Sequence, residues 1–110
     1  MRVDCTVFDF GSFANEMRQL KEKQHFDYLV TIIGEDFGAE GLGCIYILEN
    51  TETHERTSVK TIARQVGDDY VIYSVIDLWK AADLLEREVY DFYGIKFLGH
   101  PNMEYVRSCL

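Results

Sequence analysis

The residues that could do acid–base chemistry in this 110-residue chain gather in one short stretch. Four carboxylates surround a single arginine there: Asp83, Glu86, Glu88 and Asp91 around Arg87. Paired carboxylates can act as general acid and general base. On a helix Glu86 and Glu88 project about 200° apart and cannot share a site, whereas Glu88 and Asp91 lie three residues apart and can. With His100, these two form one candidate acid–base set.

The same stretch has two other interpretations. One is a solvated helix face, because Asp83–Arg87 and Arg87–Asp91 are both opposite-charge pairs at i, i+4 spacing, each worth a few tenths of a kcal/mol when exposed. The other is a contact with a partner protein. A charge network at an interface fixes register and partner choice, because an unpaired desolvated charge is costly.

Other patterns that could carry chemistry are weak. Gly41-Leu42-Gly43 begins like a dinucleotide-binding fingerprint, but Tyr46 stands where a third glycine belongs and the loop precedes a strand instead of a helix. His25 and His54 lie in no metal-ligand spacing and are expected at the surface. The serines lack the context of a nucleophile elbow. Cys44 opens an apolar strand and is expected to be a small buried hydrophobe.

Composition and charge exclude further classes of protein. The chain is 47% hydrophobic with one proline, which is typical of a single compact domain, here residues 1–110. Eleven basic residues against 19 acidic ones give a net charge of −8. Such a field repels nucleic-acid phosphates and anionic membrane surfaces, so we expect no nucleic-acid partner.

The cysteines and the apolar runs point to a reducing compartment and a chain without its own anchor. Cys5, Cys44 and Cys109 are far apart and form no CxxC pair, so neither a disulfide framework nor a cysteine-ligated metal or iron–sulfur site is indicated. The N-terminus lacks the pattern of a signal peptide, and no stretch approaches the ~20 apolar residues that span a bilayer. We expect the cytoplasm.

The first half of the chain predicts one helix followed by a series of strands. Helical spacing of apolar residues predicts a helix over 12–24, with Ser12 as its cap. The β-rich run over 27–33, ended by Gly34, is too apolar for a strand wetted on one side, so we expect it inside a sheet. The following segments are a loop over 34–43, a strand over 44–49, a turn over 50–55, a return strand over 56–66 and an extended segment over 70–73.

A second helix is predicted to start at Ser74 or Asp77. Its apolar face consists of Leu78, Ala82, Leu85, Val89 and Phe92. Gly94 is placed to adopt the left-handed conformation after the helix, and a last strand covers 95–98. Two main helices packed on a mixed, mostly antiparallel sheet make a two-layer α+β fold.

At the second helix the sequence becomes recognisable. The run from Glu86 to Ile95 reads Glu-Arg-Glu-Val-Tyr-Asp-Phe-Tyr-Gly-Ile, and Phe97, Gly99, His100 and Pro101 follow. This order closely resembles the signature of the 30 kDa subunit of respiratory complex I, known in bacteria as the C-type subunit of NADH–quinone oxidoreductase. Phe26-Asp27-Tyr28-Leu29 and segments between Ser74 and Ala82 also look like family positions, so the resemblance extends over 26–101.

The sequence departs from that family in two places. Lys80 stands where the family commonly has proline, and residues 102–107 replace a leucine and two arginines after His100-Pro101. A long C-terminal tail, which wraps neighbouring subunits in larger relatives, is absent from this sequence. Short versions of the subunit are similar to those of energy-converting, membrane-bound nickel–iron hydrogenases, so the resemblance leaves open a quinone reductase or such a hydrogenase.

The resemblance implies a cofactor-free subunit that holds no iron–sulfur cluster, flavin or quinone. It would brace the hydrophilic arm at the cytoplasmic side of the membrane and reach the membrane only through partners. The implied partners are the large subunit of the quinone or nickel–iron-type site, the cluster-bearing small subunit and a ferredoxin-like subunit.

We expect the partner interface at two segments of the chain. Its residues are Glu86, Arg87, Glu88, Asp91, Gly99, His100 and Pro101. Glu86 or Glu88 would pair with a basic residue on the large subunit. The alternatives are a stand-alone acid–base enzyme using Glu88, Asp91 and His100, and a general protein-interaction module that recruits partners through a strand edge or an apolar patch.

Overall fold

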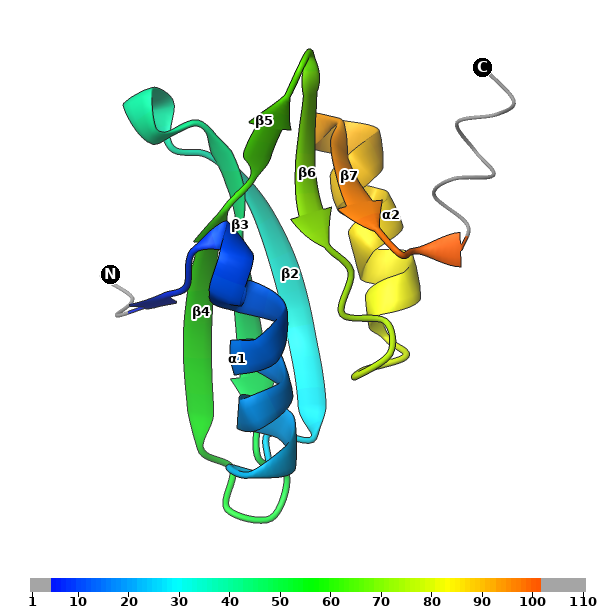
Figure 1. The fold of residues 1–110 in the computed structure, drawn as a ribbon. Coiled ribbons are helices and arrows are strands. Elements are labelled where there is room, and N and C mark those ends of the chain that lie inside the picture. Colours follow the sequence, from blue (N-terminus) through cyan, green and yellow to red (C-terminus); the bar gives the residue numbers. More distant parts are fainter. Residues whose placement is uncertain (1–4, 102–110) are drawn as a thin grey trace.

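The computed structural model describes residues 5–101, which form helices packed on strands in two layers (Figure 1). Cys109 and the departures after Pro101 lie outside the described residues. In chain order the elements are β1 (Thr6–Val7), α1 (Phe10–Glu22), β2 (Tyr28–Asp36), the short 3-10 helix η1 (Gly38–Glu40), β3 (Leu42–Glu49), β4 (Arg56–Ile62), β5 (Arg64–Val66), β6 (Asp69–Tyr73), α2 (Ala82–Tyr93) and β7 (Ile95–Leu98).

The strands divide into two sheets. The larger has the order β1-β4-β3-β2, with β2, β3 and β4 antiparallel and β1 parallel to β4. The smaller has the order β5-β6-β7, with β5 antiparallel and β7 parallel to β6. The expected α+β class with mixed, mostly antiparallel strands is therefore confirmed. What the sequence did not predict is the division into two sheets.

The break between the sheets falls inside the single return strand predicted over 56–66. At Ala63 the backbone N–H donates to the carbonyl oxygen of Leu42 at 2.8 Å, and the residue is buried. Before Ala63 the chain pairs with β3, and after it Arg64–Val66 pair with β6. The prediction of one continuous strand is wrong because a buried alanine turns the chain from one sheet into the other.

Helix α1 starts two residues before the predicted position. Asp9, not Ser12, caps it: the Asp9 carboxylate accepts from the backbone N–H and the hydroxyl of Ser12, both at 2.8 Å. The same bonds lower the pKa of Asp9. The helix lies over one face of the larger sheet (Figure 1), and its Phe13, Met17 and Leu20 side chains are buried.

Helix α2 starts at Ala82, later than either predicted position. Residues 75–79 form turns, in which the N–H groups of Leu78 and Trp79 both donate to the carbonyl oxygen of Val75 at 3.0 Å. The Trp79 indole is buried and donates to the carbonyl oxygen of Phe26 at 3.1 Å. Tertiary contacts of this kind override the local helical pattern. Gly94 ends the helix in the left-handed conformation, with φ of 75°, as predicted.

Strand β2 differs from its prediction in two ways. It lies at an edge of the larger sheet, not inside it, and it continues through Gly34 to Asp36. Gly34 marks a close approach instead of a strand end. A Cβ atom built there would lie 2.6 Å from the Tyr93 ring and 3.1 Å from Val89. The absence of a side chain at Gly34 therefore lets α2 cross β2 closely.

Replacing this glycine should destabilise the domain. In a Gly34→Ala variant the methyl group would overlap the Tyr93 ring, so we expect the free energy of unfolding in urea to fall by about 1–3 kcal/mol. Gly11→Ala is the matched control, since a Cβ there meets only Asp9 Oδ1 at 3.8 Å. Equal effects of the two substitutions would contradict the proposed close crossing.

Candidate functional site

The structure separates the carboxylates that the sequence places together. On α2, Glu86 is fully buried, whereas Arg87, Glu88 and Asp91 are exposed. This agrees with the predicted divergence of Glu86 and Glu88 on a helix. The predicted site thus consists of an internal carboxylate and an external charged surface, which have to be considered separately.

Glu86 binds inside the domain. One carboxylate oxygen accepts from the Ser74 hydroxyl at 2.6 Å, and the other accepts from the Val75 backbone N–H at 2.9 Å. Burial raises the pKa of Glu86 to about 7, while these two hydrogen bonds oppose the rise. Glu86 therefore joins the end of β6 to α2, and in this conformation its carboxylate does not reach the surface on which a partner would bind.

Two further titratable groups lie in the core near Glu86. Cys44 and Tyr46 are both fully buried on the inner face of β3, and burial raises the pKa of each. The Tyr46 ring packs against Phe13 with ring centroids 5.1 Å apart, and its hydroxyl has no hydrogen-bond partner among the described residues. The expectation that Cys44 is a buried hydrophobe is confirmed.

His100 is also internal. Its Nε2 atom lies 2.9 Å from the carbonyl oxygen and 3.2 Å from the Oδ1 atom of Asp83, and the residue is 2% exposed. Gly99 has φ of 90°, and both it and Pro101 are exposed. The contacts of the buried His100 imidazole with Asp83 therefore connect the turn after β7 to the first turn of α2. The structure brings His100 to Asp83, while Glu88 and Asp91 project outward.

The outward side of α2 is partly apolar. Phe92 is 82% exposed and Leu84 60% exposed, and the two flank the charged residues. We call this surface the exposed α2 face; it consists of Leu84, Arg87, Glu88, Asp91 and Phe92. Ala82 and Val89 of the predicted apolar face are buried, so that part of the prediction is confirmed. The prediction that Phe92 lies on the buried face is wrong, and Glu86 is the third buried residue of the helix. Arg87 forms no ion pair with a described residue, so the predicted Asp83–Arg87 and Arg87–Asp91 pairs are not formed.

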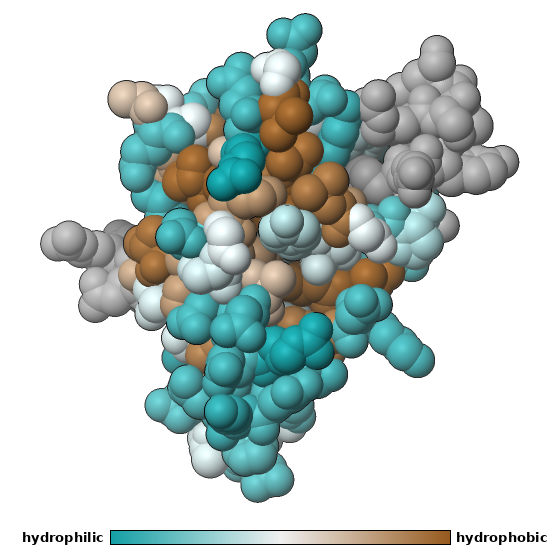
Figure 2. Space-filling view, in the orientation of Figure 1, coloured by the Kyte–Doolittle hydropathy of each residue, from teal (hydrophilic) through white to brown (hydrophobic). Residues whose placement is uncertain are grey.

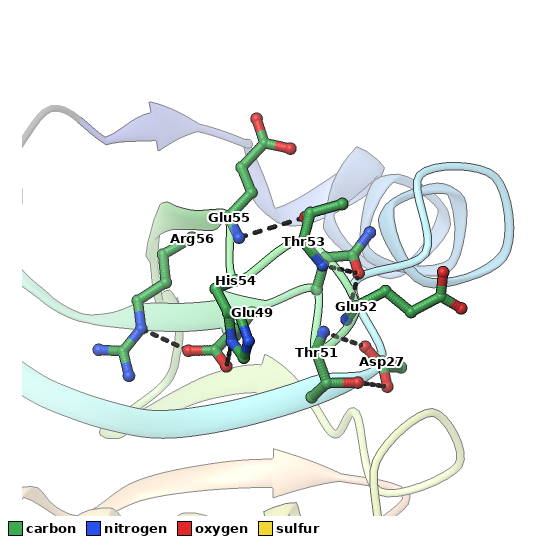
Figure 3. A network of polar contacts seen from close by, with 9 residues as sticks. Asp27, Glu49, Thr51, Glu52, Thr53, His54, Glu55 and Arg56 are labelled. Atoms are coloured by element: carbon green, nitrogen blue, oxygen red, sulfur yellow. Dashed lines mark hydrogen bonds and ion pairs between the residues drawn. The ribbon is translucent and has the colours of Figure 1, made fainter.

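The tip of the β3–β4 hairpin carries a polar network (Figure 3). Asp27 accepts from the backbone N–H and the hydroxyl of Thr51 at 2.9 and 2.6 Å, which lowers the pKa of Asp27. Glu49 pairs with Arg56 at 2.7 Å and contacts His54 at 3.6 Å. His54 is exposed, as predicted. These contacts close the hairpin on itself, so we assign the network a structural role.

A shallow polar hollow lies beside this network, at the hydrophilic end of the molecule in Figure 2. It is lined by Lys21, His25, Asp27, Asn50, Thr51 and Glu52. Several of these groups are already engaged: the Lys21 ammonium donates to the carbonyl oxygen of Leu78, and Asn50 accepts from the N–H of Glu52. Because these lining groups already form hydrogen bonds within the chain, we do not assign the hollow as a ligand site.

Residues 5–101 contain neither a clustered metal site nor a helix that could span a membrane. No group of three or more His, Cys, Asp and Glu side chains in this part of the chain is arranged to hold a metal ion. Neither α1 nor α2 has the length and apolar character needed to cross a bilayer.

Comparison with known proteins gives a consistent result. Residues 8–108 match the family described as "Respiratory-chain NADH dehydrogenase, 30 Kd subunit". The chain is 47% identical over 90 residues to the C/D subunit of an NADH-quinone oxidoreductase of Phocaeicola vulgatus, covering 80% of this chain and 17% of that protein. It is 41% identical over 83 residues to the corresponding C-type subunit of Chloroherpeton thalassium, covering 74% of this chain and 34% of that protein. It thus spans well under half the length of these two relatives.

Two solved structures have the same fold. A trypsin-resistant fragment of Nqo5 superimposes with a TM-score of 0.78 at 32% identity, covering 86% of this chain and 78% of the fragment. A chain of the membrane-bound sulfane sulfur reductase, an archaeal respiratory membrane complex, superimposes with the same TM-score at 29% identity, covering 94% of this chain and 63% of that one.

Glu86 should make stability depend on pH. Since its pKa is about 7 in the folded protein and 4.5 is its ordinary value, the folded state binds the proton more tightly. The stabilisation that protonated Glu86 gives the folded state is therefore present at low pH, and it is lost as the pH rises from about 4.5 to about 7. In Glu86→Gln this loss disappears. The stability of the wild type relative to the variant should fall by up to about 3 kcal/mol over that interval.

The measurement is urea unfolding of both proteins at several pH values. Glu88→Gln is the matched control, because it removes an exposed carboxylate of the same helix and should leave the pH profile of the wild type unchanged. Parallel profiles for the wild type and Glu86→Gln would show that the buried carboxyl does not titrate as described.

Proposed function

Because this chain belongs to the family of the 30 kDa subunit of respiratory-chain NADH dehydrogenase, we propose that it is a cofactor-free structural subunit of a complex I-like oxidoreductase. As a single domain of the hydrophilic arm, it supports electron transfer coupled to ion translocation without carrying electrons itself. The names of its relatives favour an NADH–quinone oxidoreductase. The second possibility is a related membrane-bound enzyme. A chain of the archaeal membrane-bound sulfane sulfur reductase has the same fold, and the sequence also resembles the short subunit of membrane-bound nickel–iron hydrogenases.

The observation that carries this proposal is the exposed α2 face. An aromatic ring that is 82% exposed on a regular helix, flanked by two carboxylates and an arginine without an ion pair among the described residues, is costly to leave in water and typical of an interface. The carboxylates would supply register and partner choice, and Phe92 and Leu84 would supply buried apolar area.

The domain is well suited to act as a brace. Its core joins α1, α2 and both sheets in one apolar cluster, and close-packed interiors deform little. Electron transfer requires redox centres at fixed separations, and a rigid neighbour can maintain these by packing alone. The packing of this domain therefore supports a role in holding its neighbours in position.

We propose three partners within the complex: the large subunit of the quinone-type or nickel–iron-type site, the cluster-bearing small subunit and a ferredoxin-like subunit. The chain would lie peripherally on the cytoplasmic side and reach the membrane only through them. Since Glu86 is bound internally, Glu88 and Asp91 remain to pair with a basic residue of the large subunit. The exposed Gly99 and Pro101 would extend the contact beyond α2, with His100 holding their turn in place.

Reversing the charge of this face should weaken assembly. In a Glu88→Lys/Asp91→Lys variant we expect the affinity for the complex to fall by about 1–3 kcal/mol, because attractive contacts with a basic partner become repulsive. The isolated chain should keep its stability to within about 0.5 kcal/mol, since both residues are exposed. The measurement is the yield of the other subunits that copurify with a tagged chain.

Glu52→Lys/Glu55→Lys is the matched control, because it changes the net charge equally at two exposed residues between β3 and β4. Loss of copurification only in the α2 variant is the expected result. If both variants assembled like the wild type, the exposed α2 face would not be the contact surface.

A further inference from the structure

The exposed α2 face is built from two adjacent rows of side chains. Residues four apart on an α-helix lie one above the other, and such rows form the ridges along which helices pack. On α2 one row consists of Leu84, Glu88 and Phe92, an acidic residue between two apolar ones. The neighbouring row, Arg87 and Asp91, is charged. The face therefore has a fixed order of apolar and charged groups along the helix, which a partner has to match.

The two apolar ends of the first row are both exposed and lie far apart. Leu84 is 60% exposed and Phe92 82% exposed, and eight residues of α-helix separate them by about 12 Å. The Phe92 ring packs against the Tyr93 ring, with centroids 5.1 Å apart, and Tyr93 lies over Gly34 of β2. The exposed ring thus has support from the fold, which reduces the entropy lost when a partner buries it.

The shape of this surface favours a helix as the occupant. Two parallel rows enclose a groove, and a second helix can place one of its own rows in such a groove. A helix also pairs its backbone groups internally, whereas an isolated extended segment laid on α2 would leave its N–H and C=O groups without partners. Over about 12 Å a partner helix advances seven or eight residues. Its apolar residues at that spacing would meet Leu84 and Phe92.

The charges of the face specify the middle of the partner helix. Glu88 lies halfway between Leu84 and Phe92, with Asp91 beside it, and within residues 5–101 neither carboxylate is part of an ion pair. Two carboxylates against the single Arg87 leave an excess of negative charge, which is costly to bury unless a cation pairs with it. A second copy of this chain would bring the same excess and a further net charge of −8. The charges therefore call for a basic residue from a different chain.

We propose that the exposed α2 face binds an amphipathic helix of a neighbouring subunit, whose apolar residues lie seven or eight positions apart with a lysine or arginine midway between them. This inference rests on the proposed function, to which it adds the kind of element that docks. Leu84 and Phe92 contribute apolar area at the two ends of the contact, and Glu88 and Asp91 bind the central cation. The same pattern fixes the register, because a shift of one turn would place the cation against an apolar side chain.

The test places the photo-crosslinking residue benzoylphenylalanine at Leu84 in one variant and at Phe92 in another, within the assembled complex. Both side chains are exposed, so the circular dichroism spectrum of the isolated chain should not change. The two crosslinked residues should lie in one segment of one subunit, seven or eight positions apart, with a lysine or arginine between them. Tyr28, an exposed aromatic residue at the end of β2 away from Gly34, is the matched control and should give no product with that segment.

Other crosslinking results would overturn the inference and leave the proposed function in place. Crosslinked residues three or four positions apart would indicate an extended strand. Products with two different subunits, or between two copies of this chain, would indicate another occupant. An intact complex that gives no product at either position would show that the face is not covered. Failure of the wild-type chain to copurify with any other subunit would refute the proposed function, and the inference with it.

A charge exchange tests the central contact. Glu88→Lys should lower the amount of tagged chain retained in the purified complex roughly tenfold. Changing the crosslink-identified basic residue of the partner helix to glutamate should restore most of that loss, because the pair is then re-formed with its charges exchanged. Glu52→Lys in place of Glu88→Lys is the matched control and should be retained like the wild type. Retention that stays low in the exchanged pair would contradict the assigned contact.

Discussion

The placement of α2 depends on one buried carboxylate. Glu86 accepts a hydrogen bond from the Ser74 hydroxyl and another from the Val75 backbone, and these hold the end of β6 against the inner side of the helix. A buried carboxylate is tolerated only where donors satisfy its oxygens, so the helix can rotate little about its axis. Because Glu86 faces inward, Phe92 and Glu88 face outward. The same contact that stabilises the fold therefore decides which residues a partner can reach.

Two further contacts hold α2 at its ends. At its start His100 packs against Asp83, and at its end Tyr93 lies over Gly34, where no side chain intervenes. The helix is thus fixed at three points along its length, to β6, to the turn after β7 and to β2. A surface displayed on such a helix is preorganised, which reduces the entropy lost on binding. This rigidity is the property that the proposed bracing role requires.

The surface of the domain combines strong net charge with apolar areas. A net charge of −8 keeps isolated chains apart, while the exposed α2 face offers apolar contact area to other proteins. Figure 2 shows a second region with apolar side chains, over β5, β6 and β7; Val66 of β5 is 55% exposed. This combination favours association with different chains over self-association, as a subunit of a larger assembly requires.

What the sequence by itself determined was the local structure and the family. Periodic apolar residues predicted both helices, β-rich runs predicted the strands other than β1, with β4 and β5 taken as one, and the run from Glu86 to Pro101 carried the family resemblance that the comparisons confirm. Local pattern suffices for these because helix and strand periods follow from backbone geometry.

Tertiary structure alone decided that Glu86 is buried and Phe92 exposed, that β2 is an edge strand, and that Ala63 divides the strands into two sheets. Each of these depends on partners distant in sequence. Ser74 and Val75 donate to the Glu86 carboxylate, β3 alone pairs with β2, and the Leu42 carbonyl oxygen accepts from the Ala63 N–H. No window of neighbouring residues contains them.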